Sequence, residues 1–134
     1  MVGYSVTPLI RKLGLTPEMK VLLIDPPVNY YELLGMDLSK QKVVNNEKLD
    51  FVHLFVNSRS VLESTLTKLN SQIKPTTIIW ISWYKKSAKI PTEITEDVIR
   101  EIALKSIFVD VKVCAVTDVW SGLKLVVRKE KRNF

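Results

Sequence analysis

Residues 19–35, MKVLLIDPPVNYYELLG, decide the fold that the sequence predicts. An unbroken apolar run at 21–24 is typical of a β-strand that is covered on both faces. Asp25-Pro26-Pro27 ends this run, because proline has no N–H to donate to a sheet ladder. Residues 30–34 then predict a short helix that Gly35 closes. Strand, turn and helix open a β-α-β unit, and ligands of open α/β sheets bind beyond the ends of such strands.

The turn in this stretch contains no glycine. A turn that binds a phosphate or a nucleoside needs glycine where backbone and ligand approach closely, and residues 25–29, DPPVN, offer none. The stretch therefore predicts an architecture without predicting a cofactor.

Composition is that of an ordinary globular protein. The 134 residues suffice for one domain spanning 1–134, and 46% of them are hydrophobic and 25% charged. No segment reaches the roughly 18 apolar residues of a membrane span, and the N-terminus lacks a signal-peptide pattern. Cys114 is the one cysteine, which excludes an intrachain disulfide, and we interpret it as a small core residue. We therefore expect a cytoplasmic protein without membrane contact.

The net charge of +6 permits attraction to nucleic acid but does not require it. Basic residues are scattered, and the densest cluster is the tail at 128–132, RKEKR. No nucleic-acid-binding motif accompanies the charge, and the aromatic residues lie mostly in apolar strands.

The rest of the chain alternates predicted strands and helices. Further strands are predicted at 50–56, 78–84, 109–116 and 122–128, with a short edge strand at Val43-Val44. A capping box at Ser60 starts a helix whose stripe is Leu62, Leu66, Leu69 and Ile73, and Thr95 caps a second helix. This alternation predicts a mostly parallel sheet covered on both faces. The last two strands are joined by a short loop and must be antiparallel if they pair directly. The sequence leaves open whether the last one lies at a sheet edge or pairs with a second copy.

Residues typical of catalysis do not gather in any recognisable motif. His53 is the one histidine, and because it lies inside an apolar strand we interpret it as a structural residue rather than a base or a metal ligand. No nucleophile elbow, metal-ligand spacing or Walker loop occurs, so no catalytic residue and no metal site is predicted.

The order of these segments resembles S-adenosylmethionine-dependent methyltransferases of the Rossmann-like class, whose mostly parallel sheet ends in an antiparallel strand. MKVLLID resembles the first strand of that fold, LDFVHLFV the strand near the substrate, TTIIWISW the next, and VDVKVCAV and GLKLVVRK the last two. The 25 residues between Ile24 and Asp50 are fewer than that class uses there. The resemblance therefore implies a three-layer Rossmann-like α/β fold that has lost one strand and one helix.

The whole sequence is also similar to a small bacterial family of unknown function that is methyltransferase-like. The stretches that carry this likeness are GYSVTPLIRKLGL, FVHLFVNSR, WISWYKK, TEITEDVIREIAL and VDVKVCAVTDVWSGLKLVVRK. This likeness implies a fold and no activity.

The chain departs from active methyltransferases at the cofactor contacts. Their first strand leads into a glycine-rich turn, and an acid after the second strand holds the ribose; this chain has Asp25-Pro26-Pro27 and, near Val43-Val44, Glu47. Asp25-Pro26-Pro27 also resembles the Asp-Pro-Pro-aromatic motif of amino-group methyltransferases. That motif, however, follows the substrate-side strand, where this chain has Asn57-Ser58-Arg59, so we interpret the match as a coincidence.

Any ligand is expected in the crevice beyond the strand ends. Lysines and Arg59 there suit a phosphate or carboxylate, and Trp83 or Tyr84 suits stacking on a base; the alternative is that the lysines face solvent and Trp83 completes the core. In the loop 117–122, Trp120 either folds back onto the sheet edge or contacts a partner. The candidate ligand-binding residues are Asp25, Asn29, Tyr30, Asn57, Ser58, Arg59, Ser82, Trp83, Lys85 and Lys86.

Three hypotheses for function follow. The favoured one is a catalytically inactive methyltransferase-like domain that binds a small-molecule ligand or a protein partner and needs no cofactor. The second is a methyltransferase that binds S-adenosylmethionine through a non-standard loop, and the third is a basic protein associated with nucleic acid. The sequence does not choose an oligomeric state.

Overall fold

The computed structural model describes residues 8–35 and 48–134. Two short 3-10 turns accompany the main elements, at Lys86–Ala88 and Lys129–Lys131. In chain order the main elements are α1 (Leu9–Leu13), β1 (Val21–Ile24), α2 (Tyr30–Leu34), β2 (Leu49–Phe55), α3 (Arg59–Leu69), β3 (Ile73–Tyr84), α4 (Glu96–Leu104), β4 (Phe108–Ala115) and β5 (Trp120–Val127).

The five strands form one mixed sheet in the order β1-β2-β3-β5-β4. β1, β2 and β3 are parallel, and β5 is antiparallel to both of its neighbours. This arrangement confirms the predicted α/β class with a terminal antiparallel pair. The expectation for the last strand was wrong, because β5 lies between β3 and β4 and β4 forms the edge.

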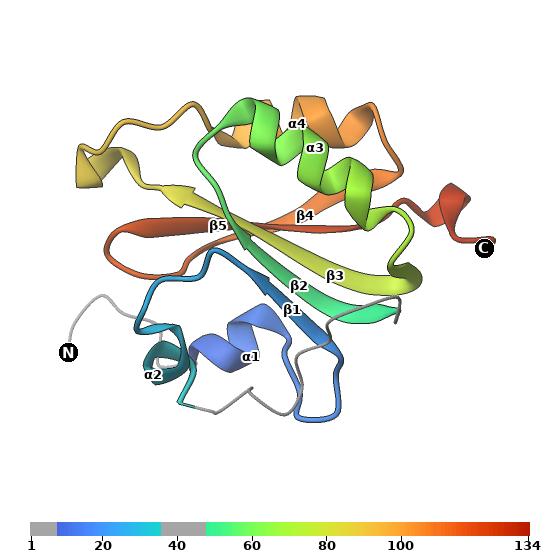
Figure 1. Ribbon diagram of the computed structural model, residues 1–134, viewed down its shortest axis with the longest axis horizontal. Coiled ribbons are helices and arrows are strands. Elements are labelled where there is room, and N and C mark those ends of the chain that lie inside the picture. The colour runs from blue at the N-terminus through green and yellow to red at the C-terminus, as the bar shows by residue number, and fades with distance from the viewer. Residues whose placement is uncertain (1–7, 36–47) are drawn as a thin grey trace.

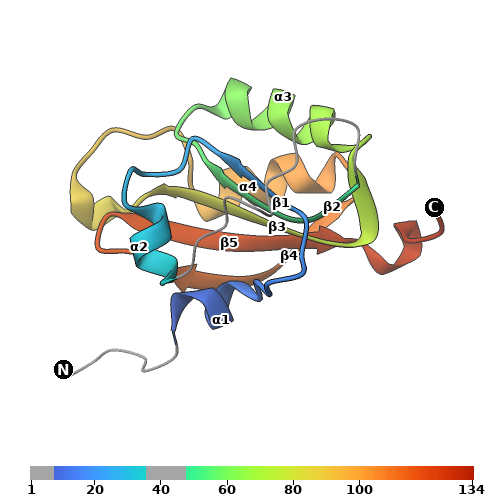
Figure 2. The ribbon, with the colours of Figure 1, turned by 60° about the horizontal axis from the view of Figure 1, so that its bottom comes forward.

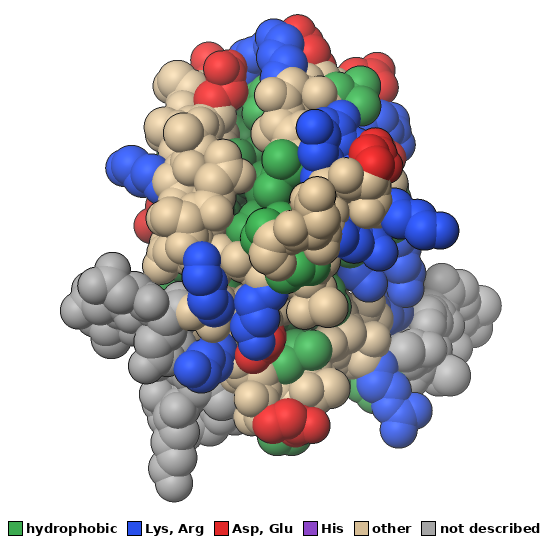
Figure 3. All heavy atoms as spheres, turned by 90° about the vertical axis from the view of Figure 1, so that its right-hand side faces the viewer, with side chains coloured by type: hydrophobic (Ala, Val, Ile, Leu, Met, Phe, Trp, Pro, Cys, Tyr) green, Lys and Arg blue, Asp and Glu red, His purple; other side chains and the backbone are tan. Residues whose placement is uncertain are grey.

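Helices cover both faces of the sheet (Figures 1 and 2). α3 and α4 lie on one face over the larger apolar cluster, which includes Leu66 and Ile102. α1 and α2 lie on the other face over a second cluster, in which the indole N–H of Trp80 donates to the carbonyl of Leu13 at 2.8 Å. Between α3 and α4 a hollow of about 130 Å³ remains, and Figure 3 shows hydrophobic side chains in a furrow in the upper half of the view.

α3 ends earlier than its apolar stripe predicts. Leu62, Leu66 and Leu69 are buried as expected, but Ile73 is the first residue of β3 and pairs with Leu49. The next pairs begin at Phe51 and Ile78, and this shift in register accommodates Pro75, which has no N–H for a ladder. Burial of Ile73 therefore continues the stripe without continuing the helix.

Helix caps agree with the sequence in one helix and differ in another. Thr95 caps α4, accepting from the N–H of Val98 at 3.2 Å. For α3 the capping residue is Ser58 rather than Ser60, and its hydroxyl accepts from the N–H of Val61 at 3.4 Å. The predicted capping box is therefore wrong, because Glu63 pairs with Arg59 instead of reaching back to the start of the helix.

Two predictions fall on residues outside the described ranges: the edge strand at Val43-Val44 and the acid Glu47. Among residues 8–35 and 48–134, no helix is both long enough and apolar enough to cross a membrane.

Candidate functional site

A hollow of about 350 Å³ opens where β1, β2 and β3 end, and we call it the strand-end crevice. The start of β5 completes it, because Trp120 pairs with Tyr84 across the sheet. Parallel strands end at one edge, so residues far apart in the sequence meet there. The crevice is lined by Asp25, Phe55, Val56, Asn57, Ser58, Val61, Tyr84 and Trp120.

The turn after β1 forms one wall of the crevice. Asp25 is exposed and has a φ of 52°, a left-handed conformation that aspartate adopts more readily than most residues. Pro26 and Pro27 carry no N–H, and the N–H of Tyr30 already donates to the carbonyl of Pro27 at 3.0 Å. The backbone of this turn therefore offers few donors to a ligand, and α2 behind it has five residues.

Asn57, two residues beyond the end of β2, is held by three hydrogen bonds. Its Oδ1 accepts from the backbone N–H of Tyr84 at 2.9 Å and from the hydroxyl of Thr92 at 2.5 Å, and its backbone carbonyl accepts from the N–H of Glu93 at 2.9 Å. Because a backbone N–H must donate, the amide orientation is fixed. Nδ2 has no partner within the described part of the chain, so it is a hydrogen-bond donor available at the crevice.

Aromatic side chains form the other wall. The ring of Trp120 lies 4.5 Å from that of Tyr84 at 31°, and 5.0 Å from that of Phe55 at 88°. Trp120 is half-buried, which agrees with its folding back onto the sheet. The hydroxyl of Thr117 shapes the preceding turn, since it accepts from the N–H groups of Val119 and Trp120, both at 3.0 Å.

Tyr30 and Ser82 lie beneath the crevice and not in it. Both are buried, and both bond the ring of His53: the hydroxyl of Tyr30 lies 2.7 Å from Nδ1, and that of Ser82 lies 2.7 Å from Nε2. Burial lowers the pKa of His53 to about 3 and raises that of Tyr30, so all three groups are neutral at pH 7.

A serine bonded to a histidine has the spacing of a nucleophile and its base. Ser82, however, is fully buried in a central strand and accessible to no substrate. The chain of Tyr30, His53 and Ser82 instead joins α2 to β2 and β3, which agrees with the structural interpretation of His53.

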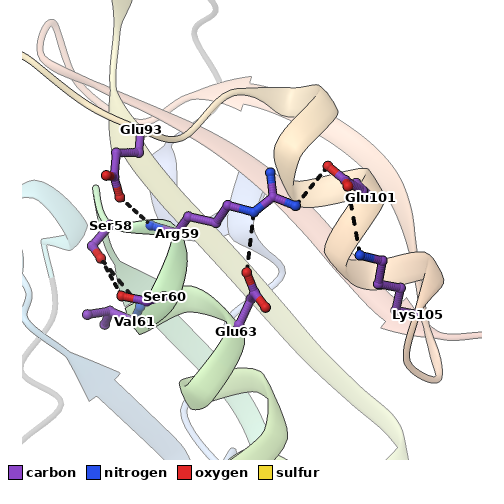
Figure 4. Close-up of polar contacts among 8 residues, drawn as sticks. All are labelled: Ser58, Arg59, Ser60, Val61, Glu63, Glu93, Glu101 and Lys105. Carbon is purple, nitrogen blue, oxygen red and sulfur yellow. Dashed lines mark hydrogen bonds and ion pairs between the residues drawn. The ribbon is translucent and has the colours of Figure 1, made fainter.

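Arg59 is engaged by acids on two helices. Its guanidinium lies 2.9 Å from Glu101 of α4 and 3.3 Å from Glu63 of α3, and its backbone N–H donates to Glu93 at 2.8 Å (Figure 4). Glu101 also lies 3.8 Å from Lys105, so acids and bases alternate across the two helices. The guanidinium is therefore directed away from the crevice.

The remaining candidates are dispersed. Trp83 is buried on the face that α3 and α4 cover, so it is part of the core there. Lys86 and Trp83 line a hollow of about 410 Å³ near the start of α4, whereas Lys85 lines one of about 240 Å³ near α1. Asn29 lines a hollow of about 340 Å³ on the other side of Trp120. The structure thus brings Asp25, Asn57 and Ser58 together and leaves the predicted anion site unassembled.

Searches of known proteins identify the fold. No protein-family model matches the sequence, and neither does any curated protein. Among solved structures, a putative type 11 methyltransferase from Sulfolobus solfataricus is similar over 92% of this chain and 91% of its own, with a TM-score of 0.60 and 16% identity.

The chain has the fold of Rossmann-like methyltransferases. A protein of the NADB-Rossmann superfamily from Streptococcus agalactiae matches over 94% of this chain and 70% of its own, with a TM-score of 0.53 and 10% identity. LepI in complex with SAM matches over 90% of this chain but 39% of its own, with a TM-score of 0.55 and 14% identity. This chain therefore spans less than half the length of LepI.

Sequence reasoning missed the aromatic wall of the crevice. The sequence suggests Tyr84 for stacking and Trp120 for folding back onto the sheet edge or for a partner contact, and nothing in its pattern singles out Phe55. The available signal is the alternation of side chains along a strand, in which neighbouring residues face opposite sides of the sheet. Tyr84 therefore faces the same side as Ser82 and Trp80, whereas Trp83 faces the other side with Ile81 and Ile79.

Proposed function

We propose that this chain is a methyltransferase-like domain that binds a small ligand in the strand-end crevice and does not transfer methyl groups. The observation that carries the proposal is the turn after β1, in which Asp25-Pro26-Pro27 takes the place of a glycine-rich loop.

This turn is poorly suited to S-adenosylmethionine. A glycine-rich turn binds a cofactor through backbone N–H groups and through the space that a missing Cβ leaves. Pro26 and Pro27 remove two N–H groups and add two rings in the same place. The helix that follows has five residues, so the partial positive charge at its N-terminus is a weak substitute for the missing N–H donors.

The crevice is better suited to a small planar ligand with N–H donors. Trp120 and Tyr84 provide an aromatic wall, the Asp25 carboxylate is an acceptor, and Nδ2 of Asn57 is a donor. A volume of about 350 Å³ lies at the small end of ligand sites, which run from about 300 to 1,000 Å³.

Calorimetric titration with S-adenosylmethionine and S-adenosylhomocysteine tests the statement that the domain does not transfer methyl groups. We expect no heat at millimolar ligand and no change in melting temperature. Binding in the micromolar range, about 8 kcal/mol, would overturn it. The second candidate, a methyltransferase with a non-standard cofactor loop, would then be preferred; the SAM-bound LepI structure of similar fold favours it.

NMR titration tests the statement that a small ligand binds in the strand-end crevice. Adenosine and cytidine carry an exocyclic amine that uridine lacks, so we expect both to shift the Asn57 side-chain amide and the Trp120 indole more than uridine does. Asn57→Asp keeps the Oδ1 acceptor and removes the Nδ2 donor, so the Trp120 indole of this matched variant should shift less. Absence of shifts at these residues with all three nucleosides would contradict ligand binding of this kind.

A further inference from the structure

Two lysines face each other across the antiparallel pair β4 and β5. Lys112 is directly opposite Lys124, and Lys124 is in turn opposite Trp80, which belongs to the cluster beneath α1. Directly paired residues point to the same side of a sheet, so both lysines lie on the α1 face. Like charges in this position destabilise a sheet, so these two lysines do not serve the stability of the fold.

The positive surface continues toward α1 and the end of β3. Lys12 and Lys85 line a hollow of about 240 Å³ together with residues 115–118 of the β4–β5 hairpin. Cys114, between this hollow and Lys112, is half-buried; burial raises the pKa of its thiol, while Lys12 and Lys112 act in the opposite direction. Lys12 and Lys112 therefore both lie near the same thiol.

The four lysines of this surface lack the acidic partners that five other basic residues have. Within residues 8–35 and 48–134, none of Lys12, Lys85, Lys112 and Lys124 forms an ion pair, whereas Arg59, Lys74, Arg100, Lys105 and Arg128 all do. Asp118 is the acid that lines the hollow. These four lysines therefore give this surface a local positive charge that no ion pair among the described residues offsets.

Aromatic rings lie at one end of this basic surface. Lys85 follows Tyr84, whose ring lies against that of Trp120, and the N–H of Lys85 donates to the carbonyl of Val119 at 2.8 Å. Proteins that bind single-stranded nucleic acid combine a positive track for the phosphates with aromatic rings on which bases stack. An acidic peptide would use the lysines and leave the rings without a role.

We propose that single-stranded nucleic acid binds across the α1 face of β4 and β5, with its phosphates on Lys112, Lys124, Lys12 and Lys85 and a base against Trp120. This goes beyond the ligand crevice, and the phosphate contacts do not depend on it, since a chain that binds no small ligand retains all four lysines.

Fluorescence anisotropy with fluorescein-labelled dT12 and U12 tests the proposal. We expect binding at 50 mM salt that weakens steeply toward 200 mM. Lys112→Gln/Lys124→Gln should weaken binding at least tenfold and reduce the slope of log K against log salt by about 1.4, since each phosphate contact contributes about 0.7. Trp120→Leu should weaken binding about tenfold with little change in that slope.

The control variant Lys68→Gln/Lys105→Gln removes the same charge from α3 and α4 on the other face. Equal losses in the two double variants would overturn the proposed location, and so would no binding at 50 mM salt. Equal affinity for duplex DNA would overturn the preference for single strands. Equal affinity for polyglutamate would show a general polyanion site instead. Circular dichroism of each variant checks that it is folded.

Discussion

Removing the hydroxyl of Tyr30 should destabilise the protein without changing its surface. In Tyr30→Phe the ring remains against His53 and Phe55, at centroid distances of 5.3 and 5.6 Å, but Nδ1 of the fully buried imidazole loses its partner at 2.7 Å. An unpaired buried polar group costs about 1–3 kcal/mol, so we expect a loss of about 2 kcal/mol in the free energy of unfolding. With a urea slope of about 2 kcal/mol/M, the midpoint should fall by about 1 M.

Urea unfolding followed by tryptophan fluorescence measures this loss. Tyr84→Phe is the matched control, because its hydroxyl makes no hydrogen bond within the described residues and its removal should cost less than about 0.5 kcal/mol. Ser82→Ala, which removes the partner of Nε2, should cost about as much as Tyr30→Phe. If Tyr30→Phe and Tyr84→Phe unfold at the same midpoint, the buried hydrogen-bond chain does not stabilise the fold and the reasoning fails.

Acidification from pH 7.5 to 5 should lower the free energy of unfolding by about 2 kcal/mol, because burial lowers the pKa of His53 from 6.5 to about 3 and only the unfolded chain takes up the proton in this range. Urea midpoints at the two pH values measure this loss. By NMR, the imidazole of the folded protein should stay neutral down to pH 5. Asn57→Ala should lower the free energy of unfolding by about 2 kcal/mol, because it removes the acceptor of Tyr84 and Thr92, whereas Asn57→Asp keeps that acceptor and should lower it less. Equal melting temperatures of the two variants would contradict this. Gly122→Ala should lower the free energy of unfolding by about 1–3 kcal/mol, since a Cβ there would lie 3.0 Å from Val116 and 3.2 Å from Trp80. Thermal unfolding of this variant, compared with that of the control variant Ser121→Ala, tests the prediction.

The sequence predicts elements well where the signals are local. The apolar run of β1 and the glycine that closes α2 require no information from elsewhere, and Gly35 does adopt a φ of 70°. The end of α3 depends on a distant strand. Ile73 suits a buried helix face as well as a strand, and pairing with Leu49 decides between them.

The candidate site shows the same division. Topology alone places Asp25, Asn57 and Ser58 at one edge, because each follows the end of a parallel strand. The direction of the Arg59 side chain depends on Glu101, which lies 42 positions away in the sequence and which α4 brings to within 2.9 Å of the guanidinium. Such a pairing depends on how two helices pack, and no local pattern in the sequence reports it.

The position of β5 bears on how the chain folds as it is synthesised. A nascent chain presents β4 before β5, yet β4 has no place in the sheet until β5 has paired with β3. The parallel unit of β1, β2 and β3 can assemble first, and the edge of β3 then stays unpaired until β5 has been synthesised. A polypeptide released before residue 120 retains that unpaired edge and a β4 with nothing to pair with, and both invite aggregation or proteolysis. The sheet can therefore be completed only after translation has passed Val127.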